Sequence, residues 1–266
     1  MARPRYPVIP FLSLAIALVF LPSGCGRPPK GDTLTIATAA NMQFSMQELV
    51  DRFSAETGIS CNLTISSSGK LTAQIREGAP FDLFVSADMK YPETLYREGL
   101  AEKPPKVYAY GKLVLWTLSD TLEPDLQALR DPNVRHIAVA NPETAPYGTA
   151  ALQVLGHYGL VEAVQEKLVF GESIAQTNQF IVSRAAEIGF TAMAAVRSPA
   201  MQGQGRWKAV NPDSYTPIAQ GVLLLKGVSG NQDGALAFYE YLSSAEAAGI
   251  LEKYGYSTHE QIERED

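Results

Sequence analysis

The segment Ser66–Ile75, with the sequence SSSGKLTAQI, places three hydroxyl groups, a glycine and a lysine at the start of an amphipathic stretch. Such residues can cradle a phosphate, supply a nucleophile, cap a helix or bind a free anion. A Walker A loop requires a glycine five positions before its Gly-Lys pair, but Thr64 stands there, and Leu71 replaces the magnesium-binding Ser/Thr. A nucleotide loop is therefore excluded, and the segment predicts a helix capped by Ser67 or Ser68.

Two kinds of chemistry remain open for this helix start. Ser68 and Lys70 are the pair that a Ser-Lys hydrolase would use, although no GxSxG elbow or other partner motif accompanies them. The histidines His136, His157 and His259 are far apart in the sequence and predict no metal site. A helix N-terminus offers free N–H groups and partial positive charge, which favours the second chemistry, anion binding.

The same arrangement recurs at three other predicted helix starts, each with small or uncharged donor groups. Asn41 follows a predicted strand and can cap a helix or donate from its amide. Ala145–Gly148 precede a helix near Thr149, and Ser173 and Gln176 have capping-box spacing. In open α/β sheets, ligands bind at such carboxyl ends of strands. The four helix starts together predict a cleft for a small anion.

The elements that must position these groups alternate along the chain, which predicts parallel sheets covered by helices on both faces. The expected strands are Thr33–Thr38, Ile59–Ile65, Phe81–Asp88, His136–Ala140, Glu187–Thr191 and Ile218–Leu225. The expected helices are one from Met42 that ends at Gly58, then Lys70–Glu77, Tyr91–Glu98, Asp125–Leu129, Thr149–His157, Ile174–Arg184, Gly234–Leu242 and Ser244–Tyr254.

Two long apolar segments, Val107–Leu118 and Ile218–Leu225, flank the second α/β series. We interpret them as crossovers between two lobes. Lobe 1 is then discontinuous and consists of residues 33–111 and 218–266, whereas lobe 2 spans residues 112–217. The length of 266 residues is sufficient for two such lobes.

The N-terminus has the pattern of an export signal. Arginines precede the apolar run Val8–Leu21, which is long enough for a signal peptide and short for a membrane span, so residues 1–24 are predicted to be a signal peptide. Cys25 in LPSGCG resembles the lipid-modified cysteine of bacterial lipoproteins, with residues 25–32 as a tether. The chain is thus predicted to lie on the periplasmic side of a membrane, lipid-anchored. An uncleaved anchor and a Cys25–Cys61 disulfide remain alternatives.

The overall composition argues against several other classes of protein. The chain is 46% hydrophobic and 19% charged, as expected of a globular protein. Its net charge of −6, without a cluster of basic residues, excludes a nucleic-acid footprint.

Several stretches resemble, in order, the molybdate-binding proteins, which are periplasmic substrate-binding components of ABC importers. They are LTIATAANMQFSMQEL, SSSGKLTAQIREGAPFDLFVSAD, YGKLVLW, IAVANPETAPYGTAAL, GESIAQTNQF, EIGFTA and AFYEYLSSAEAAGILEKYGY, from about Thr33 to Tyr256. The resemblance implies the two-lobed type II periplasmic-binding fold, in which each lobe is a mostly parallel sheet flanked by helices and two crossover strands join the lobes. It also implies a monomer that delivers its ligand to an ABC permease and ATPase.

The same resemblance implies how the ligand is held. In this family a tetrahedral dianion is bound only by neutral hydrogen bonds from hydroxyls and backbone N–H groups. Carried over by motif, the ligand-binding residues are Asn41, Ser68, Tyr147 and Ile174, the last two through their backbone N–H groups. These residues would contact molybdenum or tungsten only through the oxygens of the anion, without direct metal ligands and without a cofactor.

The sequence departs from the family at one donor. The family's hydroxyl-donating tyrosine falls on Ala192, which cannot donate from its side chain. Gln176, Thr191 or the hydroxyl of Tyr147 are the candidate replacements, and Asn41 stands where better-known members have serine. A pocket of donors alone is expected to reject phosphate, which usually carries a proton and needs an acceptor. Sulfate or an organic anion on the same fold is the alternative to molybdate or tungstate, and the chain is expected not to be an enzyme.

Overall fold

The computed structural model describes residues 33–226 and 230–258, together with Met1. The predicted signal peptide after Met1, the tether and Cys25 lie outside the described residues. Within the described ranges, no helix is both long and apolar enough to span a bilayer.

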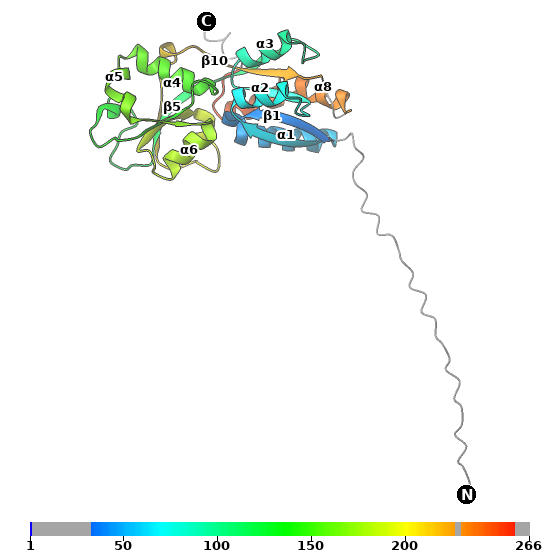
Figure 1. Ribbon diagram of the computed structural model, residues 1–266, viewed down its shortest axis with the longest axis horizontal. Coiled ribbons are helices and arrows are strands. Elements are labelled where there is room, and N and C mark those ends of the chain that lie inside the picture. The colour runs from blue at the N-terminus through cyan, green and yellow to red at the C-terminus, as the bar shows by residue number, and fades with distance from the viewer. Residues whose placement is uncertain (2–32, 227–229, 259–266) are drawn as a thin grey trace.

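Two five-stranded sheets form the frame of two lobes that lie side by side (Figure 1). The sheet of lobe 1 has the order β2-β1-β3-β10-β4 and contains β1 (Thr33–Ala39), β2 (Ser60–Ser66), β3 (Leu83–Ser86), β4 (Lys106–Gly111) and β10 (Ile218–Leu224). The sheet of lobe 2 has the order β7-β6-β8-β5-β9 and contains β5 (Leu113–Thr117), β6 (Ile137–Ala140), β7 (Leu168–Gly171), β8 (Ile188–Ala192) and β9 (Arg206–Ala209).

In each sheet one strand runs against the other four. In lobe 1, β10 pairs antiparallel with both β3 and β4, whereas β2, β1 and β3 are parallel. In lobe 2, β5 is reversed in the same way between β8 and β9. Both reversed strands follow a crossing between the lobes, because β5 begins just after Lys112 and β10 just after Pro217. A strand that enters a lobe at the boundary runs away from that boundary, whereas the parallel strands of each sheet end there. The predicted α/β fold with mostly parallel sheets is confirmed.

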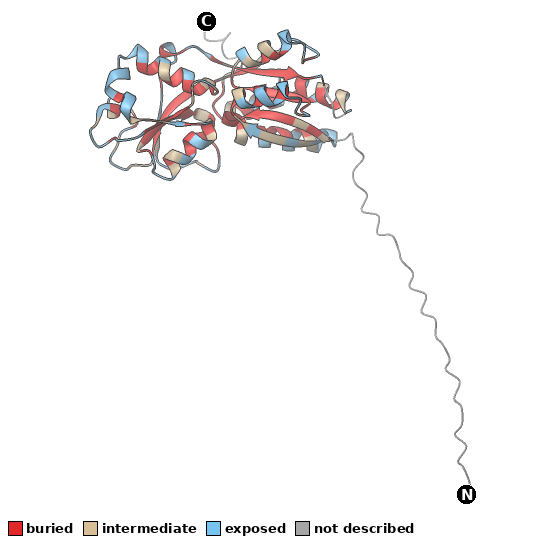
Figure 2. Ribbon diagram, in the orientation of Figure 1, coloured by how far each residue is buried: buried red, intermediate tan, exposed pale blue. Residues whose placement is uncertain are grey.

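Helices cover both faces of each sheet (Figures 1 and 2). Lobe 1 carries α1 (Gln43–Thr57), α2 (Ser68–Arg76), α3 (Lys90–Arg97), α8 (Gln232–Tyr241) and α9 (Ala245–Lys253). Lobe 2 carries α4 (Pro146–His157), α5 (Val161–Val164), α6 (Ile174–Val182) and α7 (Met193–Val196). Short 3-10 helices are η1 (Ala40–Met42), η2 (Ala128–Arg130), η3 (Gln165–Lys167) and η4 (Pro212–Ser214). The strands are mostly buried, and exposed residues lie on the outer sides of the helices (Figure 2).

One expected segment divides between the two sheets at the expected crossing, and one expected helix does not form. The apolar segment Val107–Leu118 forms two strands, β4 and β5, in different sheets, with Lys112 between them. The helix expected at Asp125–Leu129 is wrong, because only η2 forms there. The carboxylate of Asp125 accepts the N–H groups of Gln127 and Ala128 as an N-cap does, and only the short η2 follows it.

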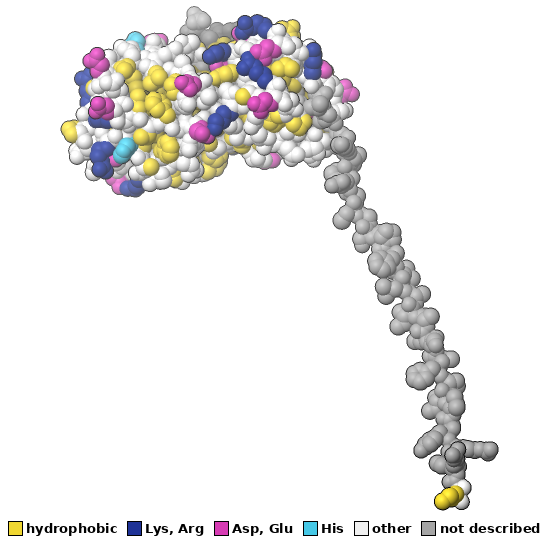
Figure 3. Space-filling model, in the orientation of Figure 1, with side chains coloured by type: hydrophobic (Ala, Val, Ile, Leu, Met, Phe, Trp, Pro, Cys, Tyr) yellow, Lys and Arg dark blue, Asp and Glu magenta, His cyan; other side chains and the backbone are white. Residues whose placement is uncertain are grey.

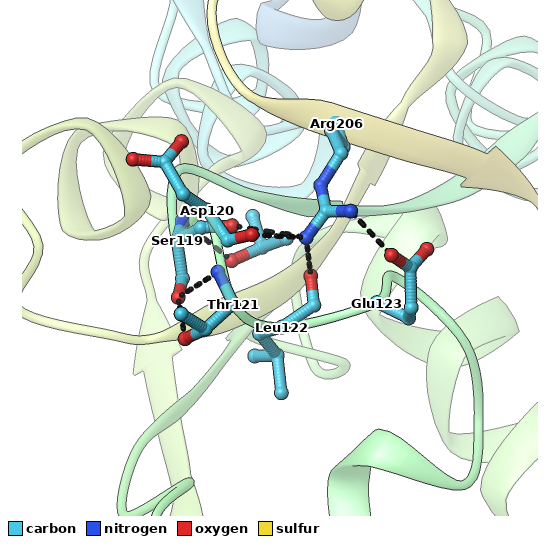
Figure 4. A network of polar contacts seen from close by, with 7 residues as sticks. Ser119, Asp120, Thr121, Leu122, Glu123 and Arg206 are labelled. Carbon is cyan, nitrogen blue, oxygen red and sulfur yellow. Dashed lines mark hydrogen bonds and ion pairs between the residues drawn. The ribbon is translucent and has the colours of Figure 1, made fainter.

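Strand β9 has no periodic apolar pattern, and its position is explained by Arg206. The guanidinium donates to the backbone carbonyls of Ser119, Asp120 and Leu122 at 3.4, 3.0 and 2.9 Å. It also pairs with the carboxylate of Glu123, and Figure 4 shows the loop wrapped around it. One side chain therefore fixes both the edge strand and the loop after β5.

The apolar core is continuous between the lobes at a few small residues. Ala194 of α7 belongs to the core cluster of lobe 1, beside Met42 and Met46. Conversely, Ala39 and Ala87 of lobe 1 pack in the cluster of lobe 2. The lobes are thus in direct contact, and the carboxyl ends of β1, β3 and β6 face one another.

Candidate functional site

A small pocket lies between the lobes where these strands end. Its lining residues are Ala39, Ala40, Asn41, Ser67, Ser68 and Ala87 from lobe 1 and Ala145, Pro146, Tyr147 and Ile174 from lobe 2. All four predicted ligand-binding residues are among them, and each is at most 4% exposed. The free space has room for about one water molecule, so a larger ligand has to widen it.

Three helices from the two lobes begin at this pocket. Ser68 is the first residue of α2, Tyr147 the second residue of α4 and Ile174 the first residue of α6. The N–H groups in a first helical turn have no partner within the helix, and the helix dipole adds partial positive charge. The first turns of all three helices lack acidic residues, which would otherwise neutralise that charge.

Two hydroxyl groups of pocket-lining residues form no hydrogen bond of good geometry with any described residue, although the Tyr147 hydroxyl lies close to the side chains of Asn41 and Gln220. They belong to Ser67 and Tyr147, which are 3% and 2% exposed. The hydroxyl of Ser68 accepts the N–H of Ala87 at 3.0 Å and keeps its own proton free to donate. Burial raises the pKa of the Tyr147 phenol well above its usual value, so that phenol stays protonated. An unpaired buried hydroxyl costs about 1–3 kcal/mol, which an acceptor ligand would recover.

Ser67 was predicted only as a helix cap, and in the structure it lines the pocket instead of capping α2. Its side chain makes no capping hydrogen bond, although Ser67 occupies the N-cap position of α2. The only local signal for its role is the run of neighbouring hydroxyls.

The side chain of Asn41 differs from the expectation that its amide is free to donate. Its Nδ2 atom donates to Gln220 Oε1 at 2.8 Å and to Tyr256 Oη at 3.0 Å, so both amide hydrogens are used. Asn41 therefore faces the pocket with its amide donors committed to the protein, and its backbone N–H is the donor left for a ligand.

Of the candidates to replace the missing tyrosine, only Tyr147 lines the pocket. The hydroxyl of Thr191 donates to Asn178 Oδ1 inside lobe 2. The amide oxygen of Gln176 accepts the N–H of Glu172 at 2.6 Å, at an exposed position. The structure brings neither Thr191 nor Gln176 to the pocket, and Ala192 is buried in the core of lobe 2.

Ser68 and Lys70 do not form a pair of nucleophile and base. The Nζ atom of Lys70 pairs with the carboxylate of Glu172 on the other lobe. The Ser68 hydroxyl is bound to Ala87, as described above. Among the described residues, no group of three or more His, Cys, Asp or Glu side chains could hold a metal ion.

Cys61 has a free thiol in the described part of the chain. Burial raises the pKa of this thiol to about 11, so it stays protonated at neutral pH. The alternative of a disulfide to Cys25 lies outside the described residues.

Several contacts bridge the two lobes near the pocket. The N–H of Gly69 donates to the carbonyl of Thr144 at 2.9 Å, and the hydroxyl of Tyr91 donates to the carbonyl of Glu143 at 3.0 Å. The Lys70–Glu172 ion pair is the third bridge. A Cβ atom at Gly69 would lie 2.9 Å from the Thr144 backbone, so a side chain there would push the lobes apart.

Comparisons with known proteins agree with this architecture. Residues 34–257 match the family model described as "Bacterial extracellular solute-binding protein". The molybdate-binding protein ModA of Azotobacter vinelandii is 39% identical over 225 residues, covering 83% of this chain and 88% of that protein. ModA of Rhodobacter capsulatus is 37% identical over 246 residues, covering 92% and 94%. The solved A. vinelandii periplasmic molybdate-binding protein superposes with a TM-score of 0.79 at 36% identity, covering 84% of this chain and 98% of that one.

Proposed function

Because this chain belongs to the bacterial extracellular solute-binding proteins and, among them, to the molybdate-binding family, we propose that it captures molybdate or tungstate outside the cytoplasm and delivers it to an ABC importer. The lobes close around the anion, which is held by backbone N–H groups at the starts of α2, α4 and α6 and by hydroxyls. Family membership supports the delivery to an ABC permease and ATPase.

The observation that carries the proposal is the unsatisfied donor set. Ser67 and Tyr147 bury hydroxyls that form no hydrogen bond of good geometry with the described residues, and three helices whose first turns lack acidic residues begin at the same pocket. A doubly charged oxyanion supplies acceptor oxygens for all of these groups. Fixed dipoles in a site without water act strongly on such a charge, so no lysine or arginine is required.

The residues that line the pocket also favour oxyanions that carry no proton over those that do. No carboxylate lines the pocket, so it contains no acidic acceptor for a ligand's proton. Molybdate, tungstate and sulfate carry no proton near neutral pH, whereas phosphate usually does. We therefore expect phosphate to be rejected, and size to separate molybdate and tungstate from sulfate.

Calorimetric titration of ligand-free protein tests the proposal. We expect tight binding of molybdate and tungstate, weaker binding of sulfate and none of phosphate. Tight binding of phosphate, or binding of sulfate in preference to molybdate, would contradict it. Metal analysis of protein purified without added anion gives an independent reading, since molybdenum or tungsten should co-purify.

We also propose that the mature chain is a lipid-anchored monomer without enzymatic activity. The position of Cys25 after the apolar run supports the anchor, and the relatives compared above are named as binding proteins. On this proposal, Cys25→Ala should release the protein from the membrane fraction, and mass spectrometry of the native protein should find acyl chains on the mature N-terminus. An unmodified Cys25 in membrane-free protein would exclude the anchor.

A further inference from the structure

Gln220 is a fully buried polar residue in the otherwise apolar strand β10. It lies just after the second crossing between the lobes, which ends at Pro217. The pairing of β10 with β4 is irregular between Gln220 and Gly221. A β-bulge of this kind re-aims a side chain and is common beside functional sites.

The hydrogen bonds of Gln220 fix the orientation of its own side-chain amide and of the side-chain amide of Asn41. Its Nε2 atom donates to the carbonyls of Ile218 at 3.1 Å and Ala87 at 3.3 Å, so its Oε1 atom must face Asn41. Asn41 consequently presents its Nδ2 atom, which also donates to Tyr256. The Tyr256 hydroxyl donates back to the carbonyl of Asn41 at 3.1 Å.

This chain of hydrogen bonds joins three pocket residues, Asn41, Ala87 and Ser68. Ala87 receives Gln220 at its carbonyl and donates its N–H to the hydroxyl of Ser68. One amide therefore connects Asn41 on one side with Ala87 and Ser68 on the other. Each hydrogen bond in this chain has a defined donor and acceptor, with the Tyr256 hydroxyl accepting one bond and donating another, and such networks hold their members in one arrangement.

We propose that Gln220 and Tyr256 are positioning residues of the anion site, which hold the Asn41 turn and the Ala87–Ser68 contact in the geometry that binds the ligand. This inference rests on the proposed function. Gln220 does not line the pocket, so it acts through Asn41 and Ala87 rather than by contact with the anion.

Gln220→Glu tests this role, because the two side chains have the same shape. A neutral carboxyl can accept from Asn41 and donate to one carbonyl, whereas a carboxylate still accepts from Asn41 but repels the carbonyls of Ile218 and Ala87. Burial raises the pKa of a carboxyl, so the variant should titrate within an accessible range. We expect its affinity for molybdate to be about 10- to 100-fold weaker at pH 8 and to recover as the pH falls to about 6.

Neighbouring titratable groups do not produce the same profile. The phenols of Tyr147 and Tyr256 are near Gln220, and burial raises the pKa of both, so they stay neutral. Asp88 follows Ala87 and titrates in wild type and variant alike. The ratio of the molybdate affinities of wild type and Gln220→Glu, measured at each pH, therefore reports the titration of residue 220 alone.

Gln153→Glu controls for the added carboxylate near the crossover, since Gln153 is exposed and pairs with Thr216 but makes no hydrogen bond to Asn41 or Ala87. Its affinity should equal that of wild type at every pH. Tyr256→Phe is the second variant, and should weaken binding several-fold without a pH profile, in protein that unfolds cooperatively. If wild type binds molybdate and Gln220→Glu follows the Gln153→Glu profile, the positioning role is refuted. If wild type binds neither molybdate nor tungstate, the proposed function itself fails.

Discussion

Ser67 and Tyr147 bury hydroxyl groups that form no hydrogen bond of good geometry with any described residue, and both residues line the same pocket. In the ligand-free protein each is a cost in the free energy of folding. In a complex with an oxyanion each becomes a donor to a charged acceptor. At the scale of residues, the site is therefore built from neutral groups whose hydrogen bonds are left incomplete by the fold.

The hydroxyl of Tyr147 gives the first prediction. Tyr147→Phe keeps the ring and the backbone N–H, and should weaken molybdate binding about 10- to 100-fold while leaving the ligand-free protein as stable or more stable. Titration calorimetry and urea unfolding measure the two effects. Tyr108→Phe is the control, because its hydroxyl is also buried without a partner but does not line the pocket. Equal affinities in the two variants would contradict a ligand-binding role for Tyr147.

The carboxyl of Asp88 gives a prediction about pH. Burial raises its pKa above the ordinary value of 3.8, against weaker opposing effects of hydrogen bonds from Tyr91 and Ser86. The folded state then holds this proton more tightly than the unfolded state, so stability falls as pH rises through the raised pKa. Urea unfolding of wild type and Asp88→Asn across this range should show wild type losing stability relative to the variant. A difference that is constant with pH would contradict the prediction.

At the scale of elements, local pattern predicts most strands and helices, and long-range contacts account for the rest. The helix expected at Lys70–Glu77 forms as α2 and begins two residues earlier, at Ser68. Strand β9 was missed because it is held by Arg206 rather than by an apolar pattern. Gln220 and Tyr256 lie 179 and 215 positions from Asn41, and no local spacing reveals such partners. A polar residue within the apolar run IAQGVLLL was the one available signal for Gln220.

The start of α4 gives a prediction at this scale. A Cβ atom at Gly148 would lie 2.1 Å from the carbonyl oxygen of Ala140, at the end of β6. Gly148→Ala should therefore displace the helix start that carries Tyr147, cost about 1–3 kcal/mol of stability and weaken molybdate binding. Gly156→Ala in the same helix meets nothing within 4 Å and should stabilise by up to about 1 kcal/mol. Urea unfolding and calorimetry of both variants provide the check, and similar behaviour of the two would refute the packing argument.

At the scale of the whole molecule, the lobes are closed on each other by polar bridges and a shared apolar contact. Charges of both signs are interspersed on the face of the two lobes shown in Figure 3, without a large patch of either sign. Among the described residues, the Lys70–Glu172 pair is the ion pair that crosses the boundary between the lobes.

The Lys70–Glu172 pair gives the prediction for closure. Its side chains are 44% and 67% exposed, so its contribution is that of a surface pair, and Lys70→Ala should raise the dissociation rate of molybdate by up to about fivefold. Glu172→Gln should raise the rate by a similar factor, because it breaks the same pair from the other lobe. Arg76 and Glu98 form a comparably exposed pair within lobe 1, and their exchange should leave the rate unchanged. Stopped-flow measurement of the molybdate dissociation rate in all variants provides the test. An unaltered rate in Lys70→Ala would show that the pair does not stabilise the closed state.

The register of β4 and β10 determines how lobe 2 is inserted into lobe 1. Gly111, where the chain leaves lobe 1, is paired directly with Ile218, where it returns. Lobe 2 thus occupies the place of the tight turn in a β-hairpin, as an insertion whose two ends are neighbours. Lobe 2 can therefore be replaced or redesigned as a single inserted segment without altering the strand order of lobe 1.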